Sequence, residues 1–437
     1  MKLNNIPMLL IILAATCLHL QAQTRVVPAA SQEKPILLSG ATAHLGNGEV
    51  IESSMIGFKE GKISLVTNIA AAVSVAEYEV IDVSGKHIYP GFILPVSNMG
   101  LSEVSALRAT NDNSEQGAYN PNVRSIIAYN TDSELIPTYR FNGILITQPT
   151  PSSGVIPGTS SIVQLDAWNW EDAIYKKDDA IHLDWPAKSF GPRWWMGETN
   201  RRPNERYQQT IDELKTLFAE AKAYADNPSP VANNLKMEAM KGVFDGTKAV
   251  FLYEDDAKGM LAGVRMLQEN GVKRIVIVGG GQAMLIKDFL LEEEIPVIVM
   301  GVHSLPDRDH EDTRYPYKLP KELHEAGIKY CLGYPGMTAN ARNLPFTAGT
   351  TVTYGVPYED ALKSITSHAA EILGIADKTG TIEKGKDANI IISEGDVFDM
   401  RTSKLTHAFI QGREVQLNAR QQWLYEKYSE KYGHDIK

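Results

Sequence analysis

Apolar and polar positions alternate in short runs at both ends of the chain. Between residues 36 and 83, the runs are separated by the turn signals Asn47-Gly48 and Glu60-Gly61. Such a pattern predicts short β-strands joined by tight turns. The same pattern returns at residues 379–392 and 407–413, so both ends of the chain are expected to be rich in strands.

The middle of the chain has a different pattern, in which apolar runs alternate with amphipathic stretches. Strands are expected at 248–254, 273–278, 295–300 and 328–332, and helices at 255–270, 282–294 and 321–326. Regular strand–helix alternation predicts βα units around a parallel sheet. One α/β barrel accounts for the whole middle of the chain.

Residues 167–230 are less regular and contain five of the six tryptophans: Trp168, Trp170, Trp185, Trp194 and Trp195. These side chains either form a platform for a carbohydrate or peptide or staple an inserted segment to the barrel, and the second interpretation is favoured. Residues 201–224 predict a solvated amphipathic helix, and residues 416–437 predict a helical tail to which no function is assigned.

The composition is that of an ordinary globular protein, with 437 residues, 43% hydrophobic and 22% charged. This length accommodates two or three average domains, or one large barrel with an accessory module. The formal net charge is −10, and no lysine- or arginine-rich block reverses it. We therefore expect no nucleic-acid partner.

The N-terminus has the pattern of a secretory signal peptide over residues 1–22. Lys2 precedes an apolar run from Ile6 to Leu20, and the small residue Ala22 offers a cleavage site before Gln23. A membrane anchor needs a longer apolar run, and a lipid anchor at Cys17 is the less favoured alternative. We expect an exported, periplasmic protein without a membrane span. Its mature part has one cysteine, Cys331, and therefore no intrachain disulfide.

Several motifs resemble the amidohydrolase superfamily, in its imidazolonepropionase-like and exported dipeptidase-like branch. The run Tyr-Pro-Gly-Phe-Ile at 89–93 resembles the entry to that family's first barrel strand, and residues 100–103, 343–349 and 361–374 resemble further family segments. The resemblance covers residues 36–415. It implies a TIM-like (β/α)8 barrel at 91–378, a small composite β-sandwich at 35–90 and 379–415, and the tail at 416–437.

The same resemblance implies a catalytic site with one or two divalent ions and a proton-shuttling aspartate at the C-terminal ends of the strands. In the family the first strand continues as Asp-x-His-x-His, but this chain has Leu94, Val96 and Asn98 there. The fifth-strand histidine falls at Tyr253, the sixth-strand position lies in 278–282 without a histidine, and the aspartate position lies near Tyr334. The ligand positions are therefore degenerate, and no zinc or other cofactor is expected.

Other residues suggest a replacement site. The loop 303–312 follows the seventh strand and includes His303, Asp307 and His310, which suit a rebuilt metal site, although such loops are usually solvated and self-paired. Glu103 and Arg108 are candidates for binding a charged ligand, with a structural ion pair as the favoured alternative. The Gly279–Gly281 run lacks the spacing of a nucleotide-binding loop.

The expected function is that of an exported amidohydrolase-superfamily protein that has lost its metal ligands. We expect a noncatalytic homologue that binds a small molecule or supports a partner, as a homo-oligomer or as a hetero-oligomer with an active amidohydrolase. The alternative is an active hydrolase of non-peptide or dipeptide C–N bonds that uses a rebuilt site near His303 and His310.

Overall fold

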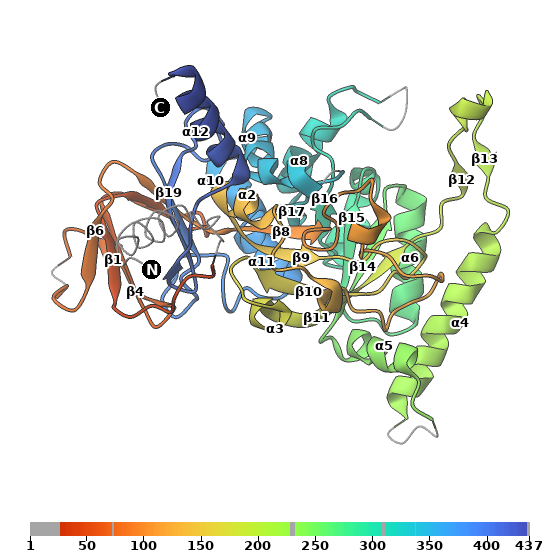
Figure 1. Ribbon diagram of the computed structural model, residues 1–437. Helices are drawn as coiled ribbons and strands as arrows, with labels where there is room; N and C mark the ends of the chain where they lie inside the picture. The colour runs from red at the N-terminus through yellow and green to blue at the C-terminus, as the bar shows by residue number, and fades with distance from the viewer. Residues whose placement is uncertain (1–26, 72–73, 228–231, 307–310, 337, 435–437) are drawn as a thin grey trace, which may run out of the picture.

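The computed structural model describes residues 27–71, 74–227, 232–306, 311–336 and 338–434. A central barrel-like sheet has a smaller two-sheet unit on one side and a long hairpin-and-helix excursion on the other (Figure 1). The predicted fold class, a TIM-like α/β barrel with a β-sandwich built from both chain ends, is confirmed. The predicted signal peptide lies outside the described residues.

The sandwich consists of a four-stranded and a six-stranded sheet. The first sheet contains β1 (Ile36–Ser39), β4 (Ser54–Lys59), β5 (Lys62–Asn68) and β6 (Glu79–Asp82). The second contains β2 (Thr42–His44), β3 (Val50–Ile51), β7 (His87–Pro90), β18 (Ile390–Ser393), β19 (Leu405–Ile410) and β20 (Arg413–Glu414). Strand β7 pairs with β18, which joins the two ends of the chain. Both sheets bury apolar side chains in one core that includes Ile56, Phe58 and Phe409.

Eight strands form the barrel in chain order. They are β8 (Phe92–Ser97), β9 (Ile144–Pro149), β10 (Thr159–Gln164), β11 (Ile174–Asp184), β14 (Ala249–Glu254), β15 (Ile275–Gly279), β16 (Val297–Val299) and β17 (Tyr330–Leu332). The sheet is nearly closed: α11 packs against both β8 and β17, and the Ile93 N–H donates to the Ile365 carbonyl at 2.9 Å. The expected fifth, sixth and eighth strands are therefore β14, β15 and β17.

One strand departs from the expected parallel arrangement. Strand β10 is antiparallel to both β9 and β11. Its connections at 150–158 and 165–173 are short, and a parallel strand needs a longer crossover, usually with a helix. The short connections therefore reverse the chain direction at β10.

Helices lie around the barrel, in the excursion after β11 and at the C-terminus (Figure 1). They are α2 (Ile136–Phe141), α3 (Trp170–Ala173), α4 (Tyr207–Asp226), α5 (Leu235–Asp245), α6 (Ala257–Glu269), α7 (Lys287–Glu292), α8 (Tyr315–Ala326), α9 (Leu344–Thr353), α10 (Tyr358–Ser364), α11 (Ser367–Leu373) and α12 (Arg420–Tyr432). Short 3-10 turns occur at η2 (Arg108–Thr110), η3 (Ser125–Ala128), η4 (Trp194–Met196), η5 (Ala283–Ile286) and η6 (Thr338–Asn343). The helix expected at 282–294 is divided into two elements. Its first turn, η5, is of the tighter 3-10 type that is common at helix N-termini, and α7 follows it. No helix in the described ranges is long and apolar enough to cross a membrane.

The excursion after β11 contains a hairpin and two packed helices. Strands β12 (Ser189–Phe190) and β13 (Arg202–Pro203) form the hairpin, and α4 follows it. Helix α4 has the predicted amphipathic character, because Ile211, Leu214, Phe218 and Ala221 are buried along one stripe.

The five tryptophans of this region do not share one role. Trp185 is buried and Trp170 packs against the main core, so the stapling interpretation holds for these two. It is wrong for Trp168, Trp194 and Trp195, which are 67%, 78% and 66% exposed.

Candidate functional site at the barrel mouth

The parallel barrel strands end on one side of the sheet, where TIM-like barrels build their sites. Val96, Asn98, Tyr253 and Tyr334 all lie at or just after such strand ends and are half-buried. Val96 and Tyr253 pack against the apolar cluster inside the barrel, which includes Phe251. Tyr334 instead packs against the larger core outside the barrel sheet.

A bulge in β8 changes the expected geometry of the first strand. Leu94 pairs with Thr147, but the next pair is Ser97 with Pro149, so β8 carries one extra residue. Val96 lies in this bulge with φ of 50°, a strained conformation for a β-branched residue. As a result, Leu94 packs in the outer core while Val96 packs inside the barrel. The bulge therefore places these two side chains on opposite faces of the barrel sheet.

At the fifth-strand position, Tyr253 is bonded to a histidine from the neighbouring strand. Its hydroxyl lies 2.8 Å from Nδ1 of His182 on β11, and the His182 ring meets Phe251 edge-on. Burial lowers the pKa of His182 to about 3, so the ring is neutral at neutral pH. Burial, and then the charges of Asp184 and Asp179, raise the pKa of Tyr253 well above its usual value. The tyrosine is therefore protonated.

His182 has an unused hydrogen-bonding atom inside the barrel. Its Nε2 is buried, and no partner for it exists among the described residues. Asp184 lies two residues further along β11 and hence on the same face of the strand. Burial raises the pKa of Asp184 to about 6. Together, the two side chains place a buried imidazole edge and a readily protonated carboxyl at the C-terminal end of β11.

A second carboxylate, Asp179, is held deeper in the barrel. It accepts hydrogen bonds from Ser160 Oγ at 2.8 Å and Gln148 Nε2 at 2.7 Å. Burial raises the pKa of this carboxyl. Gln148 Oε1 also accepts from the Val96 N–H at 3.1 Å, so the bulge in β8 is tied to this polar cluster.

Sequence reasoning missed Asp179, His182 and Asp184, all on β11. A signal was present, because the stretch Asp-Asp-Ala-Ile-His-Leu-Asp places a histidine and an aspartate two positions apart at the end of an apolar run. In a strand, that spacing puts both side chains on one face. The ligand positions considered from the sequence lie on the first, fifth, sixth and eighth strands and leave out the fourth.

The other candidate residues are dispersed. Glu103 accepts hydrogen bonds from Asn130 Nδ2 at 3.2 Å and Ser133 Oγ at 2.9 Å. Arg108 is exposed on η2 and, within the described part of the chain, forms no ion pair with Glu103. The favoured structural ion pair is therefore not formed.

Of the three residues of the proposed replacement site, the structure describes His303. His303 Nε2 lies 2.8 Å from Thr350 Oγ1, and its ring lies 5.7 Å from that of Tyr317. Asp307 and His310 lie outside the described residues.

The donor atoms at the expected ligand positions do not fit a zinc centre. Val96 has no donor atom, and the Tyr253 hydroxyl is protonated and bonded to His182. Zinc in proteins is held by imidazole, thiolate and carboxylate groups. Over the described ranges, no group of three or more histidine, cysteine, aspartate or glutamate side chains is arranged to hold a metal ion.

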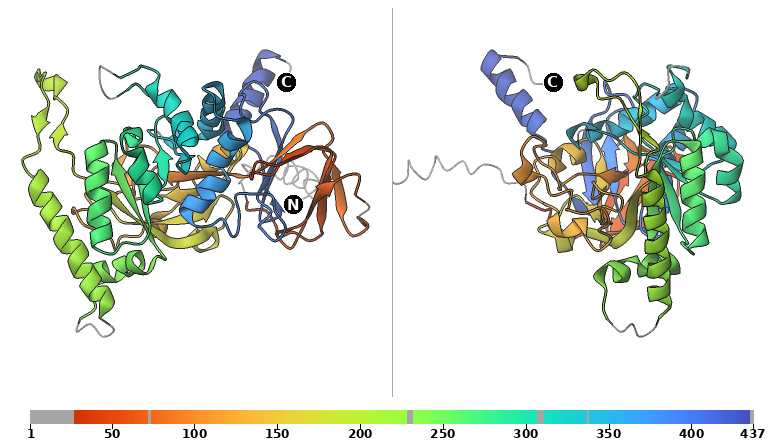
Figure 2. Two further views of the ribbon diagram at one scale, coloured as in Figure 1. Left: turned by 180° about the vertical axis from the view of Figure 1, so that it is seen from behind. Right: turned by 90° about the vertical axis from the view of Figure 1, so that its right-hand side faces the viewer.

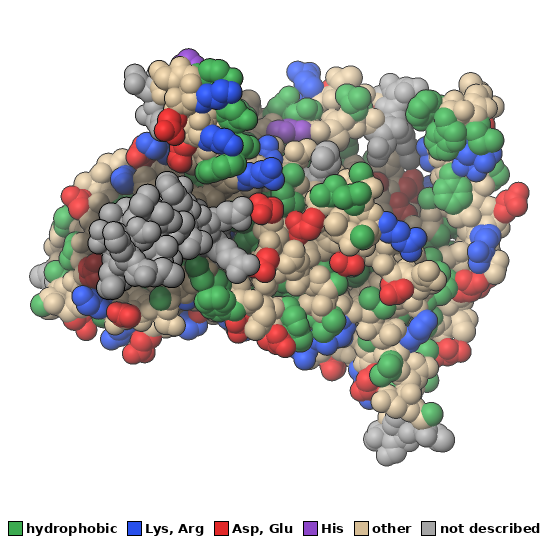
Figure 3. All heavy atoms as spheres, in the orientation of Figure 1, with side chains coloured by type: hydrophobic (Ala, Val, Ile, Leu, Met, Phe, Trp, Pro, Cys, Tyr) green, Lys and Arg blue, Asp and Glu red, His purple; other side chains and the backbone are tan. Residues whose placement is uncertain are grey.

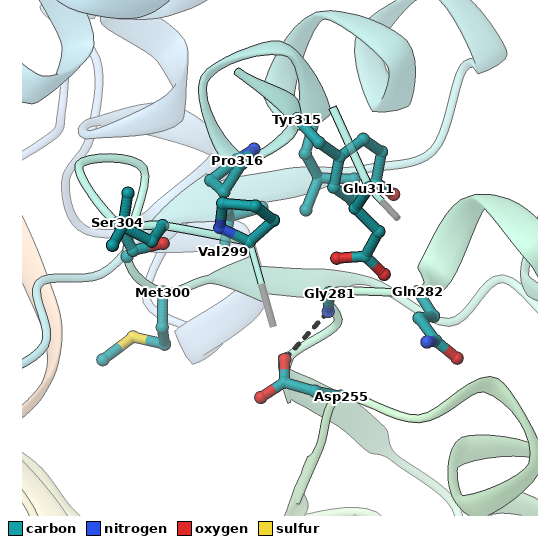
Figure 4. Close-up of a pocket in the computed structure, with 13 residues that line it drawn as sticks. Asp255, Gly281, Gln282, Val299, Met300, Ser304, Glu311, Tyr315 and Pro316 are labelled. Atoms are coloured by element: carbon teal, nitrogen blue, oxygen red, sulfur yellow. Dashed lines mark hydrogen bonds between the residues drawn. The ribbon is translucent and has the colours of Figure 1, made fainter. Parts of the chain in front are cut away.

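A small cavity of about 120 Å³ lies beside the mouth, at the ends of β15 and β16 (Figure 4). Asp255 accepts a hydrogen bond from the Gly281 N–H at 2.8 Å at its edge. Gly279 has φ of 103°, and a Cβ there would approach the Asp255 carboxylate to 2.6 Å. The glycine run therefore forms a tight turn against Asp255, which accounts for its composition without a nucleotide.

A larger cavity of about 1000 Å³ lies between the barrel and the sandwich, away from the mouth. Two ion pairs, Asp166–Arg413 and Lys62–Asp387, form between its charged lining residues. Asp166 is buried and accepts from Arg140 Nη1 at 2.7 Å and from the Ala29 N–H at 3.0 Å, and it forms an ion pair with Arg413 Nη1 at 3.1 Å. This network ties the barrel to the sandwich.

Comparisons with known proteins agree with the geometry. The sequence model of the Amidohydrolase family matches residues 308–415. Amidohydrolase tasK of Hapsidospora irregularis is 21% identical over 373 residues, which cover 77% of this chain. The chain spans only 37% of the length of that curated relative.

Solved structures show the same fold. An amidohydrolase from Thermotoga maritima MSB8 superposes with a TM-score of 0.75 at 23% identity, over 87% of this chain and 99% of that one. A Xaa-Pro dipeptidase with bound methionine gives 0.53 at 14% identity, over 87% and 100% of the two chains. An ochratoxinase from A. niger gives 0.53 at 12% identity, over 87% and 95%.

Proposed function

We propose, from the premise that the chain belongs to the amidohydrolase superfamily, that it is an exported, noncatalytic member of that superfamily. In this proposal its barrel binds a small polar molecule at the mouth, and its surface supports a partner subunit. The observation that carries the proposal is the hydrogen bond between Tyr253 and His182 at the position of the family's fifth-strand ligand.

The chemistry of the mouth supports binding rather than hydrolysis. Metal-dependent hydrolysis needs a bound water of lowered pKa and a base that accepts its proton. Here Tyr253 keeps its proton and His182 stays neutral, so neither side chain is a strong base. The unused Nε2 of His182 and the carboxyl of Asp184 are instead suited to hydrogen-bond a small polar ligand.

The partner role is supported by the length of the curated relative. The region similar to this chain makes up little more than a third of that protein, so there a region of this kind is joined to further sequence. We infer that this chain likewise works beside a second subunit, with an active amidohydrolase as the favoured partner. Co-purification from the native source tests this part, and recovery of this chain without any partner contradicts it.

Export is the third part of the proposal and rests on the N-terminal pattern alone. N-terminal sequencing of the secreted protein is expected to begin at Gln23. Retention of Met1 in the mature protein contradicts export by a cleaved signal.

The alternative function is hydrolysis at a rebuilt site around His303, Asp307 and His310. His303 already bonds Thr350, which leaves one of its ring nitrogens for other contacts. Replacement of His303 and His310 by alanine separates the two functions, because only the rebuilt site loses bound metal and activity.

The deciding experiment is elemental analysis of the folded, metal-repleted and buffer-exchanged protein, followed by assays on dipeptide, hydantoin and lactam substrates. We expect far less than one transition-metal ion per chain and no hydrolysis. Near-stoichiometric zinc, manganese or iron together with turnover would overturn the noncatalytic proposal.

A further inference from the structure

Two projections rise from the same side of the molecule. One is the hairpin after β11, residues 186–206, which we call the arm. The other is helix α12 at the C-terminal end. Figure 1 shows them at opposite ends of its upper side, and both also rise on the upper side in the two views of Figure 2. The body between them does not rise above them, so one flat surface can touch both.

The tip of the arm is a convex group of apolar side chains. Beside the exposed Trp194 and Trp195, Met196 is 62% exposed. Gly197 adopts φ of 73° directly after η4, which turns the chain back toward β13. The two indole rings meet edge-on with centroids 5.9 Å apart. The turn therefore holds two amphipathic rings at the outermost point of the arm.

The arm is basic although the chain as a whole is acidic. Between residues 186 and 206 there are five basic and two acidic residues, for a net charge of +3, against −10 for the whole chain. Three of the basic residues pair with glutamates: Arg193, Arg202 and Arg206. Lys188 and Arg201 form no ion pair within the described part of the chain, so their charges are available to an anionic partner.

Helix α12 presents the same two kinds of side chain. Trp423, Tyr428 and Tyr432 are exposed on it. Lys427 Nζ lies 4.8 Å from the centroid of the Trp423 ring, and Lys431 Nζ lies 5.1 Å from that of Tyr432. Positions four apart lie on one face of a helix, so rings and ammonium groups form one mixed surface. The space-filling view shows apolar and basic side chains together at both projections (Figure 3).

This composition suits the interface of a lipid bilayer that carries anionic headgroups. Trp and Tyr are enriched where membranes meet water, because their rings have an apolar body and a polar edge. Lys and Arg near the bilayer surface are attracted to anionic lipids. Salt screens charges beyond about 8 Å. The bilayer therefore responds to the cations that touch it rather than to the net charge of the chain.

The separation of the two projections favours a bilayer over a single protein partner. A stable protein interface buries about 800 Å² of each partner in one patch. Here the exposed aromatic side chains lie on two projections with the body of the chain between them. A bilayer is flat over the dimensions of a protein, so it contacts both projections without a shape of its own to match.

We propose that the chain attaches peripherally to an anionic lipid bilayer, with the tip of the arm and α12 as its two contacts. Each contact places aromatic rings among the headgroups and cations near the phosphates. Because both contacts belong to one body, the second forms at a high effective concentration once the first is made. The proposal does not depend on the noncatalytic role, since neither contact includes a residue of the mouth.

Flotation with lipid vesicles tests the proposal on the protein from its expected mature start at Gln23. All described helices and strands follow that residue, and the apolar run from Ile6 to Leu20, which would itself bind lipid, is left out. The protein is expected to float with vesicles of mixed phosphatidylglycerol and phosphatidylcholine. It is expected not to float with phosphatidylcholine alone, and added salt should weaken the binding.

Variants of each projection identify the contacts. Trp194→Ser/Trp195→Ser in the arm and Trp423→Ser/Tyr432→Ser in α12 are each expected to weaken vesicle binding at least about 10-fold. Trp168→Ser is the matched control, because Trp168 is similarly exposed but lines the cavity between the barrel and the sandwich; this variant should bind like wild type. Circular dichroism and thermal unfolding confirm that each variant is folded.

Three outcomes would overturn the proposal. Wild-type protein that does not float with phosphatidylglycerol vesicles excludes the bilayer, and equal binding to phosphatidylcholine excludes the role of the cations. Unchanged binding in either double variant shows that its projection is not a contact. Loss of a co-purifying acidic protein in both double variants, without vesicle binding by the wild type, would assign the two projections to a protein partner instead.

Discussion

His182 and Asp184 are expected to change the stability of the fold with pH in opposite directions. Both side chains come from one face of β11, and burial shifts both pKa values toward the uncharged form. The pKa of His182 falls from its ordinary 6.5 to about 3, whereas that of Asp184 rises from 3.8 to about 6. The perturbations to compare are His182→Gln and Asp184→Asn, each of which removes one titrating group.

The signs follow from proton linkage. Below about pH 6.5 the unfolded chain protonates His182 but the folded chain does not, so this group lowers stability as the pH falls. Between pH 3.8 and about 6 the folded chain keeps the proton of Asp184 while the unfolded chain loses it, so this group lowers stability as the pH rises. Between about pH 4 and 6 the two contributions oppose each other.

The magnitude follows from the shifts. One proton of difference corresponds to about 1.4 kcal/mol per pH unit, so His182 changes the free energy of unfolding by about 2–3 kcal/mol between pH 6 and 4. Asp184 is half-buried, and solvent screening reduces its contribution to about 1–2 kcal/mol. Relative to wild type, His182→Gln should gain stability on acidification and Asp184→Asn should lose it.

Urea unfolding at a series of pH values measures both differences. Because all other titrating groups are shared, the difference between each variant and wild type isolates the replaced side chain. A His182→Gln difference that does not change with pH would mean that water reaches the imidazole. The burial that lowers the pKa of His182 would then be wrong.

Three further variants test other parts of the structure. Tyr253→Phe removes the hydrogen bond to Nδ1 of His182 and leaves that buried nitrogen unpaired, so the free energy of unfolding should fall by about 1–3 kcal/mol. An unchanged free energy of unfolding would show that the His182 ring has another partner. Asp166→Asn should lower the free energy of unfolding by about 3–5 kcal/mol because it leaves the buried Arg140 guanidinium without its anionic partner. Asp399→Asn, at the exposed Arg401 pair, should leave stability nearly unchanged, and equal losses in the two variants would contradict the buried network. Val96→Gly should change the free energy of unfolding by less than about 1 kcal/mol, because relief of the strained φ offsets the lost packing. Val276→Gly, in the buried part of β15, should lower it by at least about 2 kcal/mol. A large loss at Val96 would mean that its conformation is unstrained.

The barrel was predictable from sequence because its inner strands are buried on both faces. The runs at 248–254 and 273–278 contain few polar residues, and the helix between them begins at an Asp256 cap that accepts from the Lys258 and Gly259 N–H groups. Local preference and burial agree there. The direction of β10 depends on the length of its connections rather than on its own residues, which is why the pattern did not predict the antiparallel strand.

The mouth was less predictable from sequence because its backbone departs from regular strand geometry. No local preference predicts a valine at φ of 50°, or the bulge that places Leu94 and Val96 on opposite faces of the sheet. Strain of this kind persists only where surrounding contacts enforce it, and here Gln148 accepts the Val96 N–H while also binding Asp179. The bulge and the buried polar cluster on β9, β10 and β11 therefore support each other. The ligand positions considered from the sequence lie on the first, fifth, sixth and eighth strands. They revealed the missing ligands at Val96 and Tyr253 but not the polar groups on β9, β10 and β11 that hold Val96 in place.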